Sequence, residues 1–512
     1  MIARSMNRCI QPQGNRQINR RDLLLNGSSV LAMLALASIA TANPTSAAAQ
    51  STAPRPHIVC IVADDLGWKD VGFHGSDIKT PNIDKLAQDG ARLEQFYVQP
   101  MCTPTRAALM TGRYPCRYGL QTLVIPTPAK YGLPTDEWLL PQALKEPGYR
   151  TAMVGKWHLG HADRKFWPRQ RRFDYHYGSM VGEVDYFTHS STNVRDWYRN
   201  DKPVNEPGYV TQLWGADAVA QIDAHDPKTP LFLYLAFTAP HSPYQAPKEY
   251  IDRYRHIEDP TRRTYAAMIT CMDDEIGKLV SALERKKMRQ NTLIVFMSDN
   301  GGNQTALLAG DADVSKLKLP ADNGSYRGGK GMLYEGGTRV AAFANWPGQI
   351  RAGEVRETMH VVDMFPTLAG ANLAKPGKGK PLDGLDVWAT VSKGAPSPRQ
   401  EVVYNIEPFR GGVRAGDWKL IWRTPLPSAT QLYNIPQDPS EKKPIWPKAI
   451  RRRSGSCSPA SNNSPGRAPS PCFLPTRSRR SRGALTGRLR CPTRKPFSRK
   501  VTEGEGLRGR PR

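Results

Sequence analysis

The sequence has few cysteines for its length, eight in 512 residues, and few long apolar runs. Only four of the eight cysteines lie between residues 51 and 440, which excludes a fold held together mainly by disulfides. Apart from a short apolar run near the N-terminus, interrupted by Asn26 and Gly27, no stretch could cross a bilayer, so we expect no stable membrane span. A chain this long without these supports must build a large hydrophobic core, and we expect two domains.

Acidic residues are scarce at the end of the chain. Residues 441–512 contain 20 lysines and arginines against three glutamates, and they supply most of the net charge of +26. Clustered arginine can bind phosphate, but this segment has no interleaved aromatic residues and no amphipathic period, so we expect neither nucleic-acid nor membrane binding. Out-of-frame translation of GC-rich coding DNA would produce such a composition, and a native disordered tail is the alternative.

Residues 1–49 have the organisation of an export signal: a basic region, an apolar run, and small residues suited to cleavage near Ala47 to Ala49. Arg20 and Arg21, ahead of an aspartate and three leucines, are typical of the twin-arginine type. We therefore predict a protein exported to the periplasm or the extracellular space.

The pattern of apolar segments predicts an α/β fold. Continuous apolar runs at 57–63, 231–237 and 292–298 end in polar residues, as buried strands of a parallel sheet do, and a helical pattern spans 264–287. A helix after Thr80, with Pro81 at its first position and Gly90 as its stop, lies between two of them. We predict a large, mostly parallel central sheet flanked by helices over residues 56–375, then a smaller antiparallel sheet domain over 376–440.

Polar side chains follow three of these strands: Asp64 and Asp65, then His241, then Asp299 and Asn300. Binding sites of such folds lie at the carboxyl ends of the strands, so we expect these groups to converge. Their hard oxygen atoms suit Ca²⁺ or Mg²⁺ rather than Zn²⁺. The alternative is that each pair merely caps a turn or a helix.

Cys102 stands in MCTPTRAALMTGRYP, residues 101–115, just before a helical pattern. It could be ordinary core, a thiolate activated by the helix N-terminus and a nearby cation, or the precursor of a modified residue. Lys156, His158 and Lys330 stand in loop-like settings and are either solvated charges or site residues. A metal, cations and histidines together are what cleavage of a tetrahedral anionic ester requires.

The segment CTPTRAALMTGRYP resembles the signature of type I sulfatases, in which the C-x-P-x-R cysteine is oxidised to formylglycine. IVADDLGWKDVGFHGS, GYRTAMVGKWHLG, FTAPHSPY, SDNGG and GGKGMLYEGGTRV resemble further blocks of that family, over about residues 56–440. The resemblance implies an alkaline phosphatase-like fold and maturation by a formylglycine-generating enzyme. GEVDYF and the residues around GYRTAMVGKWHLG most resemble the arylsulfatase B, or N-acetylgalactosamine-4-sulfatase, branch.

Carried over position by position, the resemblance implies a metal site at an oxidised cysteine. Ca²⁺, with Mg²⁺ as the alternative, would be bound by an oxygen of the modified Cys102 together with Asp64, Asp65, Asp299 and Asn300. The hydrated aldehyde would present two geminal hydroxyls, one of which attacks sulfur. The resulting ester could collapse by elimination, a route closed to a serine sulfate.

The resemblance also implies roles for the basic residues. Arg106, Lys156 and His158 would hold the diol and its alkoxide, and His158 would later remove the proton that expels sulfate. Lys156 and Lys330 would bind sulfate oxygens. His241 would hydrogen-bond or protonate the leaving alcohol.

The implied activity is hydrolysis of aryl or sugar sulfates, with the 4-sulfate of N-acetylgalactosamine at a glycan end as the expected substrate. We expect Asp185, Tyr186 and the segment after His241 to line the pocket. The rival functions are a phosphodiesterase or phosphonate monoester hydrolase of the same superfamily and a non-catalytic protein that binds sulfated glycans. The sequence departs from the family after about residue 440, so we expect the small domain to be truncated.

Overall fold

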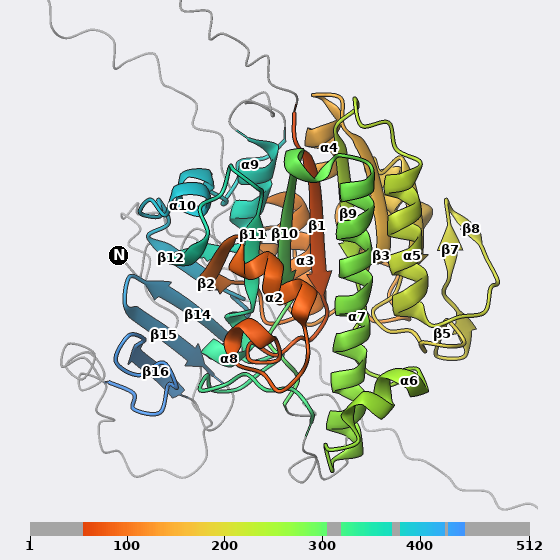
Figure 1. Ribbon diagram of the computed structural model, residues 1–512. Helices are drawn as coiled ribbons and strands as arrows, with labels where there is room; N and C mark the ends of the chain where they lie inside the picture. The colour runs from red at the N-terminus through yellow and green to blue at the C-terminus, as the bar shows by residue number, and fades with distance from the viewer. Residues whose placement is uncertain (1–54, 305–318, 371–378, 425–428, 446–512) are drawn as a thin grey trace, which may run out of the picture. The chain divides into compact units, whose positions relative to one another are not determined.

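The computed structural model describes residues 55–304, 319–370, 379–424 and 429–445. Its largest element is a ten-stranded sheet with the strand order β12-β2-β11-β10-β1-β9-β3-β4-β7-β8 (Figure 1). The strands are β1 (His57–Ala63), β2 (Ala91–Tyr97), β3 (Arg150–Lys156), β4 (Tyr175–Ser179), β7 (Tyr198–Arg199), β8 (Lys202–Pro203), β9 (Leu231–Ala236), β10 (Thr292–Ser298), β11 (Ala342–Asn345) and β12 (Gly353–His360). A separate two-stranded ribbon joins β5 (Ser190–Ser191) to β6 (Val194–Arg195).

The centre of the sheet is parallel, as predicted. Strands β10, β1, β9, β3 and β4 all run in one direction, whereas β11 and β7 are antiparallel to their neighbours. Every residue of β1, β9 and β10 is buried, because both faces of these strands are covered. Cys60 of β1 and Cys271 of a covering helix are both fully buried. Both lie in the core, as their apolar sequence surroundings predicted.

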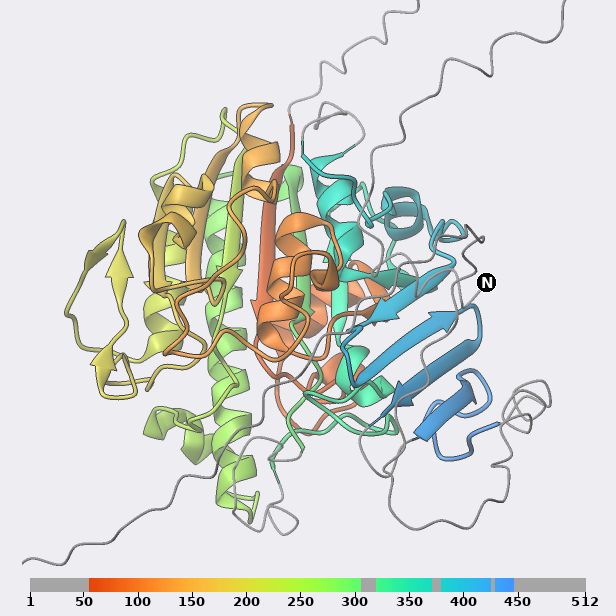
Figure 2. The same cartoon turned by 180° about the vertical axis from the view of Figure 1, so that it is seen from behind.

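Helices cover both faces of the sheet. In Figure 1, α2 (Pro81–Gln88), α5 (Val210–Asp223) and α7 (Pro260–Arg285) lie in front of the strands. Figure 2 shows α3 (Cys102–Thr111) on the other face, where α4 (Leu140–Lys145) and α9 (Met364–Ala369) pack with it. Each face therefore has its own large hydrophobic cluster, with the sheet between them. The shorter helices are α6 (Lys248–Ile251), α8 (Glu335–Thr338) and α10 (Trp388–Lys393).

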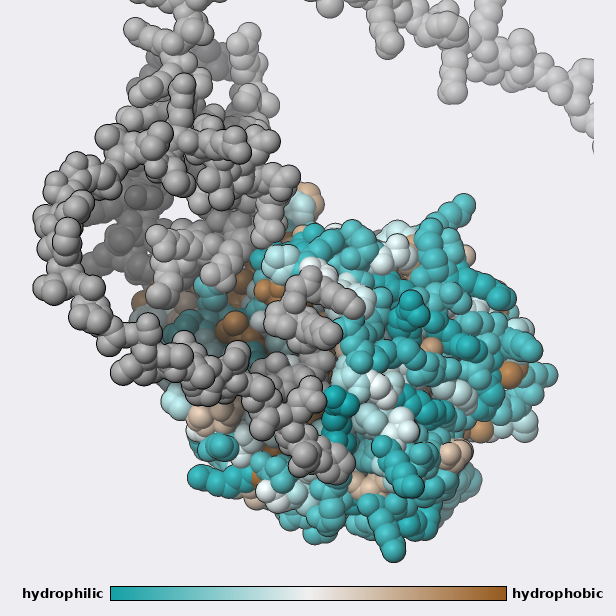
Figure 3. All heavy atoms as spheres, turned by 90° about the horizontal axis from the view of Figure 1, so that it is seen from above, coloured by the Kyte–Doolittle hydropathy of each residue, from teal (hydrophilic) through white to brown (hydrophobic). Residues whose placement is uncertain are grey.

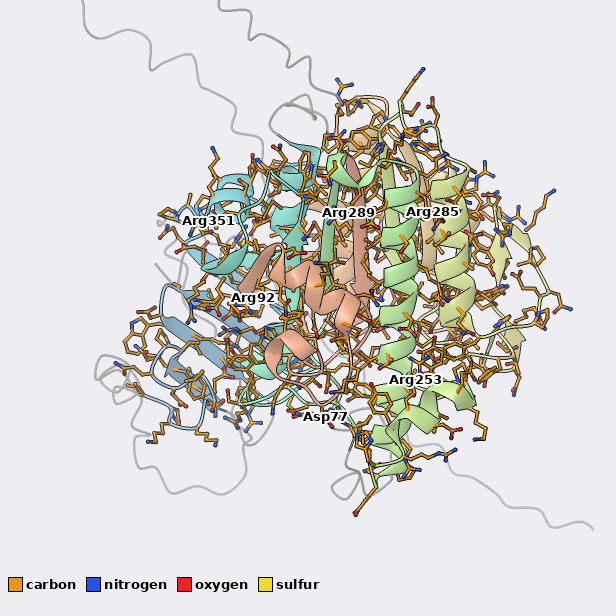
Figure 4. All side chains as sticks on the ribbon, in the orientation of Figure 1. Asp77, Arg92, Arg253, Arg285, Arg289 and Arg351 are labelled. Atoms are coloured by element: carbon orange, nitrogen blue, oxygen red, sulfur yellow. The ribbon has the colours of Figure 1, made fainter. Side chains whose placement is uncertain are left out.

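Helix α7 begins four residues earlier than its apolar pattern predicted. Asp259 caps the helix by accepting hydrogen bonds from the backbone amides of Thr261 and Arg262, and Pro260 occupies the first position. Arg285 pairs with Asp223 of α5, and Arg253 pairs with Asp274. Figure 4 labels both arginines. These exposed pairs contribute little stability, so the helix is held mainly by its buried face.

Helix α2 is present where it was predicted, but its start is fixed differently. The Thr80 hydroxyl donates to Asp84 and accepts from the Gly72 amide, and it forms no capping bond to the helix. Asp273 of α7 instead accepts hydrogen bonds from the backbone amides of Asn82 and Ile83, at 3.2 and 2.7 Å. A carboxylate from a neighbouring helix thus satisfies the first free amides of α2.

The predicted small antiparallel sheet is also present. It consists of β13 (Glu401–Tyr404), β14 (Arg410–Ala415), β15 (Trp418–Arg423) and β16 (Ala429–Asn434), paired in chain order. Gly416, with φ of 55°, takes the left-handed conformation in the turn between β14 and β15. A third apolar cluster, which includes Tyr97, Leu333 and Tyr404, joins this sheet to the large one.

Several predictions concern residues that the structure does not describe. The export signal at 1–49, the boundary at 375 and residues 446–512 lie outside the described ranges. Glu441, the first residue of the predicted basic tail, is described and is fully buried. The face in Figure 3 is mostly hydrophilic with isolated apolar residues, and no helix of the described ranges is long and apolar enough to cross a membrane.

Candidate active site

The two predicted pairs of polar residues meet at the carboxyl ends of β1 and β10. Parallel pairing places Ala63 opposite Ser298, so Asp64 and Asp65 leave β1 beside Asp299 and Asn300. The Asp65 amide donates to Asp299 Oδ1 at 3.3 Å. All four side chains are buried, which concentrates three carboxyl groups and an amide in a space removed from water.

This cluster suits a divalent cation. Asn300 Nδ2 donates to Asp65 Oδ1 at 2.8 Å, while the buried Oδ1 of Asn300 has no partner among the described residues. Burial and the adjacent Asp64 raise the pKa of Asp299 to about 6, because ionised carboxylates in so small a volume repel one another. The free amide oxygen could coordinate a bound Ca²⁺, which would also neutralise the carboxylates. These oxygen ligands are the type that Ca²⁺ prefers.

Ligand atoms of Asp64, Asp65, Cys102 and His241 lie within 4.8 Å of one another. His241 was predicted to contact the leaving group and not the metal. Asp299 is turned partly away from this group, because its Oδ2 accepts a hydrogen bond from Arg106 Nε at 2.9 Å. The sequence therefore predicted which residues gather here. It did not predict which of them face a metal position and which pair with the basic side chains.

Cys102 is the first residue of α3, and its Sγ donates to Asp64 Oδ1 at 3.3 Å. Burial, followed by Asp299 and Asp64, raises the pKa of this thiol well above its usual value. The interpretation of Cys102 as an activated thiolate is therefore disfavoured. Its polar neighbours also exclude ordinary core, so the third interpretation, a precursor of a modified residue, fits this placement best.

Arg106 lies one helical turn after Cys102 and is 1% exposed. Besides its bond to Asp299, its guanidinium donates to the Lys156 carbonyl oxygen at 3.0 Å. One buried side chain thus connects α3 to the ends of β10 and β3. A planar guanidinium with several donors is suited to such a junction.

Two lysines approach the carboxylates from different elements. Lys156, the last residue of β3, forms an ion pair with Asp64, and Lys330 Nζ donates to Asp65 Oδ2 at 2.8 Å. Lys330 is flanked by glycines, and a Cβ on Gly329 would lie 2.3 Å from the Gly302 carbonyl oxygen. The glycine is required for this close approach. The pair with Asp65 and a side chain that is 11% exposed show that Lys330 is not a solvated charge.

Both predicted histidines lie at the cluster. Burial and then Lys156 hold the pKa of His158 well below its usual value, and burial and then Lys330 lower that of His241 to about 4. His241 Nδ1 lies 2.6 Å from the Ser242 carbonyl oxygen, which can only accept, so Nδ1 carries the proton and Nε2 faces Asp65 at 3.7 Å. Both rings are therefore uncharged at neutral pH.

The structure adds residues that the sequence did not reveal. The Thr103 hydroxyl donates to the His158 carbonyl oxygen at 3.0 Å and accepts from the Ile125 amide, so it fixes the His158 loop. Glu183 Oε2 lies 3.9 Å from His241 Nδ1 and is largely exposed. Glu183 belongs to the GEVDYF segment, of which only Asp185 and Tyr186 were predicted from the sequence as pocket residues.

The expected pocket residues Asp185 and Tyr186 are placed differently. Tyr186 is fully buried, and its hydroxyl lies 2.9 Å from the carbonyl oxygens of Thr238 and His241, so it supports the His241 loop from below. Asp185 accepts from Gln245 Nε2 at 2.7 Å. The expectation that Tyr186 lines the pocket is wrong, because no part of its side chain reaches the surface.

A buried oxygen cluster ringed by ammonium, guanidinium and imidazole groups, at the carboxyl end of an α/β sheet, is typical of proteins that bind a tetrahedral anionic ester beside a metal ion. The chain belongs to the sulfatase family. The Sulfatase family model matches residues 56–372, which include all of the predicted site residues.

Curated relatives agree with this assignment. The chain is 40% identical to arylsulfatase J of Mus musculus over 390 residues, which cover 74% of this chain and 63% of the relative. It is 35% identical to N-acetylgalactosamine-6-sulfatase of Mus musculus over 362 residues, or 66% of each protein. The chain therefore spans just under two thirds of the length of these relatives.

Solved structures support the fold. The crystal structure of Ps i-CgsB in complex with k-i-k-neocarrahexaose is similar with a TM-score of 0.69 and 35% identity, over 79% of this chain and 90% of that one. PsFucS1 sulfatase from Pseudoalteromonas sp. is similar with a TM-score of 0.64 and 27% identity, over 78% and 90% of the two chains. The predicted alkaline phosphatase-like fold, with its additional antiparallel sheet, is confirmed.

Proposed function

We propose that this chain is a sulfuric ester hydrolase whose nucleophile is made from Cys102. The observation that carries the proposal is the position of the Cys102 thiol, 3.3 Å from Asp64 Oδ1 at the start of α3, among oxygen ligands and cations. Oxidised to formylglycine and hydrated, residue 102 would supply the oxygen that attacks sulfur. Ca²⁺, held by Asp64, Asp65, Asp299 and Asn300, would supply the positive charge that polarises the ester and the nucleophile.

The chain's own residues have distinct tasks in this proposal. Lys156 and Lys330 bind sulfate oxygens, and Arg106 keeps Asp299 and the start of α3 in register. His158, uncharged because of its burial, accepts the proton when sulfate is expelled. His241 directs Nε2 at the site, with its ring held by the Ser242 carbonyl group, and Nε2 must first take up a proton to donate it to the leaving oxygen.

For the substrate, we propose a sulfated amino sugar at a glycan end, with N-acetylgalactosamine 4-sulfate as the first candidate. The resemblance of GEVDYF to the arylsulfatase B branch supports it. A relative named N-acetylgalactosamine-6-sulfatase and a similar protein solved with k-i-k-neocarrahexaose support a sugar sulfate in general. Specificity would come from polar side chains beside His241, such as Glu183, that hydrogen-bond the hydroxyl groups of the preferred sugar.

We also propose that the protein is exported by its twin-arginine-like N-terminus and matured by a formylglycine-generating enzyme. The export proposal rests on residues 1–49 of the sequence alone. The maturation proposal rests on CTPTR at residues 102–106 and on the burial of Cys102, which requires that oxidation precede folding or accompany it.

The test compares two substrates in parallel. Protein produced with a formylglycine-generating enzyme should hydrolyse an aryl sulfate at least about a hundredfold faster than an aryl phosphodiester at equal concentration, a difference of about 2.7 kcal/mol in activation free energy. Cys102→Ala should retain the fold and lose the activity. Faster hydrolysis of the phosphodiester would replace this proposal by the rival phosphodiesterase function.

A further inference from the structure

The loop that carries Lys330, residues 327–338, lies between the strand ends of the active site and the small sheet. On its inner side the Lys330 amide donates to the Gly302 carbonyl oxygen at 3.2 Å, and the Gly331 amide donates to that of Pro100 at 2.7 Å. The Gly301 amide in turn donates to the Gly337 carbonyl oxygen at 3.1 Å. The loop is therefore bonded to the residues that follow Asn300 and to those that precede Cys102.

On its outer side the same loop is bonded to the small sheet. Arg410 of β14 donates to the Gly331 carbonyl oxygen at 2.7 Å, one residue from Lys330. The Tyr334 hydroxyl donates to Gln431 of β16 at 2.9 Å. Arg327 donates to the Glu441 carbonyl oxygen, also at 2.9 Å. The small sheet and the segment after it thus contact both ends and the middle of the loop.

A buried ion network centred on Lys419 of β15 also joins the loop to the small sheet. Its Nζ lies 2.9 Å from Glu335 Oε1 and 3.2 Å from Glu441 Oε1, and all three side chains are fully buried. Glu335 also accepts from the Tyr97 hydroxyl at 2.7 Å, and its backbone amide donates to Glu441 Oε2 at 2.5 Å. Removing one member of such a network leaves an unpaired charge away from water.

The loop has little room to adjust if Glu335 moves. A Cβ on Gly336 would lie 2.2 Å from the Gly328 carbonyl oxygen, and one on Gly337 would lie 2.1 Å from that of Met332. The backbone therefore packs against itself between Lys330 and Glu335. A displacement of Glu335 is transmitted to Lys330 because closely packed segments do not absorb it.

We propose that Lys419, Glu335 and Glu441 are positioning residues for Lys330, so that the small sheet completes the anion site of the large one. The part of this inference that concerns sulfate binding rests on the proposed function, whereas the ordering of the loop does not. The buried charges hold one loop conformation. Apolar side chains in place of these charged ones could stabilise the folded protein equally well without fixing that loop conformation.

The test is hydrogen–deuterium exchange of the full chain with Lys419→Met and a matched control, Arg399→Met. Arg399, just before β13, forms another buried ion pair, with Asp363, and none of its hydrogen bonds or ion pairs within the described ranges involves residues 327–338. Lys419→Met should raise exchange of the amides in 327–338 at least about tenfold, while Arg399→Met should leave this peptide unchanged. Equal exchange of 327–338 in the wild type and Lys419→Met, or an equal rise in both variants, would overturn the inference.

Kinetics supply a second readout. Lys419→Met should raise KM for an aryl sulfate, and the inhibition constant of inorganic sulfate, by about tenfold, as expected for a displaced charged donor. If the wild type hydrolyses no sulfate ester, the proposed function fails, but the exchange experiment still decides the positioning role. If Lys419→Met does not fold, Arg410→Met, at a partly exposed position, should produce the same local rise in exchange, and an unchanged peptide would contradict the inference.

Discussion

At residue 102 the chain places a neutral thiol among carboxylates, where a cysteine used directly as a nucleophile would be poorly activated. Burial raises the pKa of this thiol most, and Asp299 and Asp64, which a bound cation would neutralise, raise it further. Arg106 pairs with Asp299, Lys156 pairs with Asp64, and Lys330 pairs with the third carboxylate, Asp65. The side chains therefore act as one charge-balanced unit, and single substitutions should affect both metal and anion binding.

Metal binding provides the first prediction. Chelation should abolish sulfatase activity, Ca²⁺ should restore it, and saturating Ca²⁺ should raise the thermal unfolding temperature, since a ligand at a hundred times its Kd adds about 2.7 kcal/mol. Asn300→Ala should lose most of this shift, because it removes the unpaired amide oxygen. Asn82→Ala, on α2, should keep it. Full activity after chelation, or an unchanged shift in Asn300→Ala, would contradict the metal assignment.

At the scale of helices and strands, the sequence predicted the elements that are marked by an apolar pattern within one segment. The apolar runs predicted β1, β9 and β10, and parallel topology then predicted that Asp64, Asp65, Asp299 and Asn300 would meet. The partners of these elements could not be predicted, because they are remote in sequence: Asp273 at the start of α2, Thr103 under the His158 loop, and Tyr186 under the His241 loop. Such long-range contacts produce no periodic pattern in the sequence.

The role of Asp273 gives a prediction about one helix. Asp273→Ala leaves the first amides of α2 without acceptors, so the free energy of unfolding in urea should fall by about 2 kcal/mol. The matched control is the next residue, Asp274, whose pair with Arg253 is exposed, and Asp274→Ala should cost less than about 1 kcal/mol. Equal losses in the two variants would show that α2 does not depend on this carboxylate.

The Lys419 network makes stability depend on pH. Burial, with Glu335 beside it and Lys419 only partly offsetting the effect, raises the pKa of Glu441 from 4.5 to about 7. The folded state therefore binds this proton more tightly than the unfolded state does, and the protein loses stability as pH rises from about 4.5 to about 7. Glu441→Gln mimics the protonated acid, so its stability relative to wild type should increase by about 2–3 kcal/mol between pH 4.5 and 8. An unchanged difference across this range, measured by urea unfolding, would exclude a titration of Glu441.

At the scale of the whole molecule, the small sheet is bound to the catalytic part through the Lys330 loop, and this contact extends to Glu441. The sequence placed the start of the basic tail at residue 441. Because Glu441 is buried, a truncation that tests the tail should keep the chain up to residue 445 together with the small sheet.

Two truncations test this boundary. A chain ending at residue 445 should hydrolyse an aryl sulfate within a few-fold of the full-length rate, because the deleted segment has a basic composition and no hydrophobic period. A chain ending at residue 440 loses Glu441 and should unfold at a lower temperature with a higher KM. Equal behaviour of the two would contradict the role of Glu441, and inactivity of the longer one would mean that the tail is needed.

The central claim is that residue 102 is an oxidised cysteine acting as a sulfatase nucleophile. The most direct measurement is the mass of the peptide that contains residue 102, taken from the same preparation in which aryl sulfate hydrolysis is measured, with and without a co-expressed formylglycine-generating enzyme. We predict that the aldehyde mass appears with that enzyme, and that specific activity rises in proportion to the aldehyde fraction. Activity that is the same in preparations with an unmodified Cys102 would contradict the account.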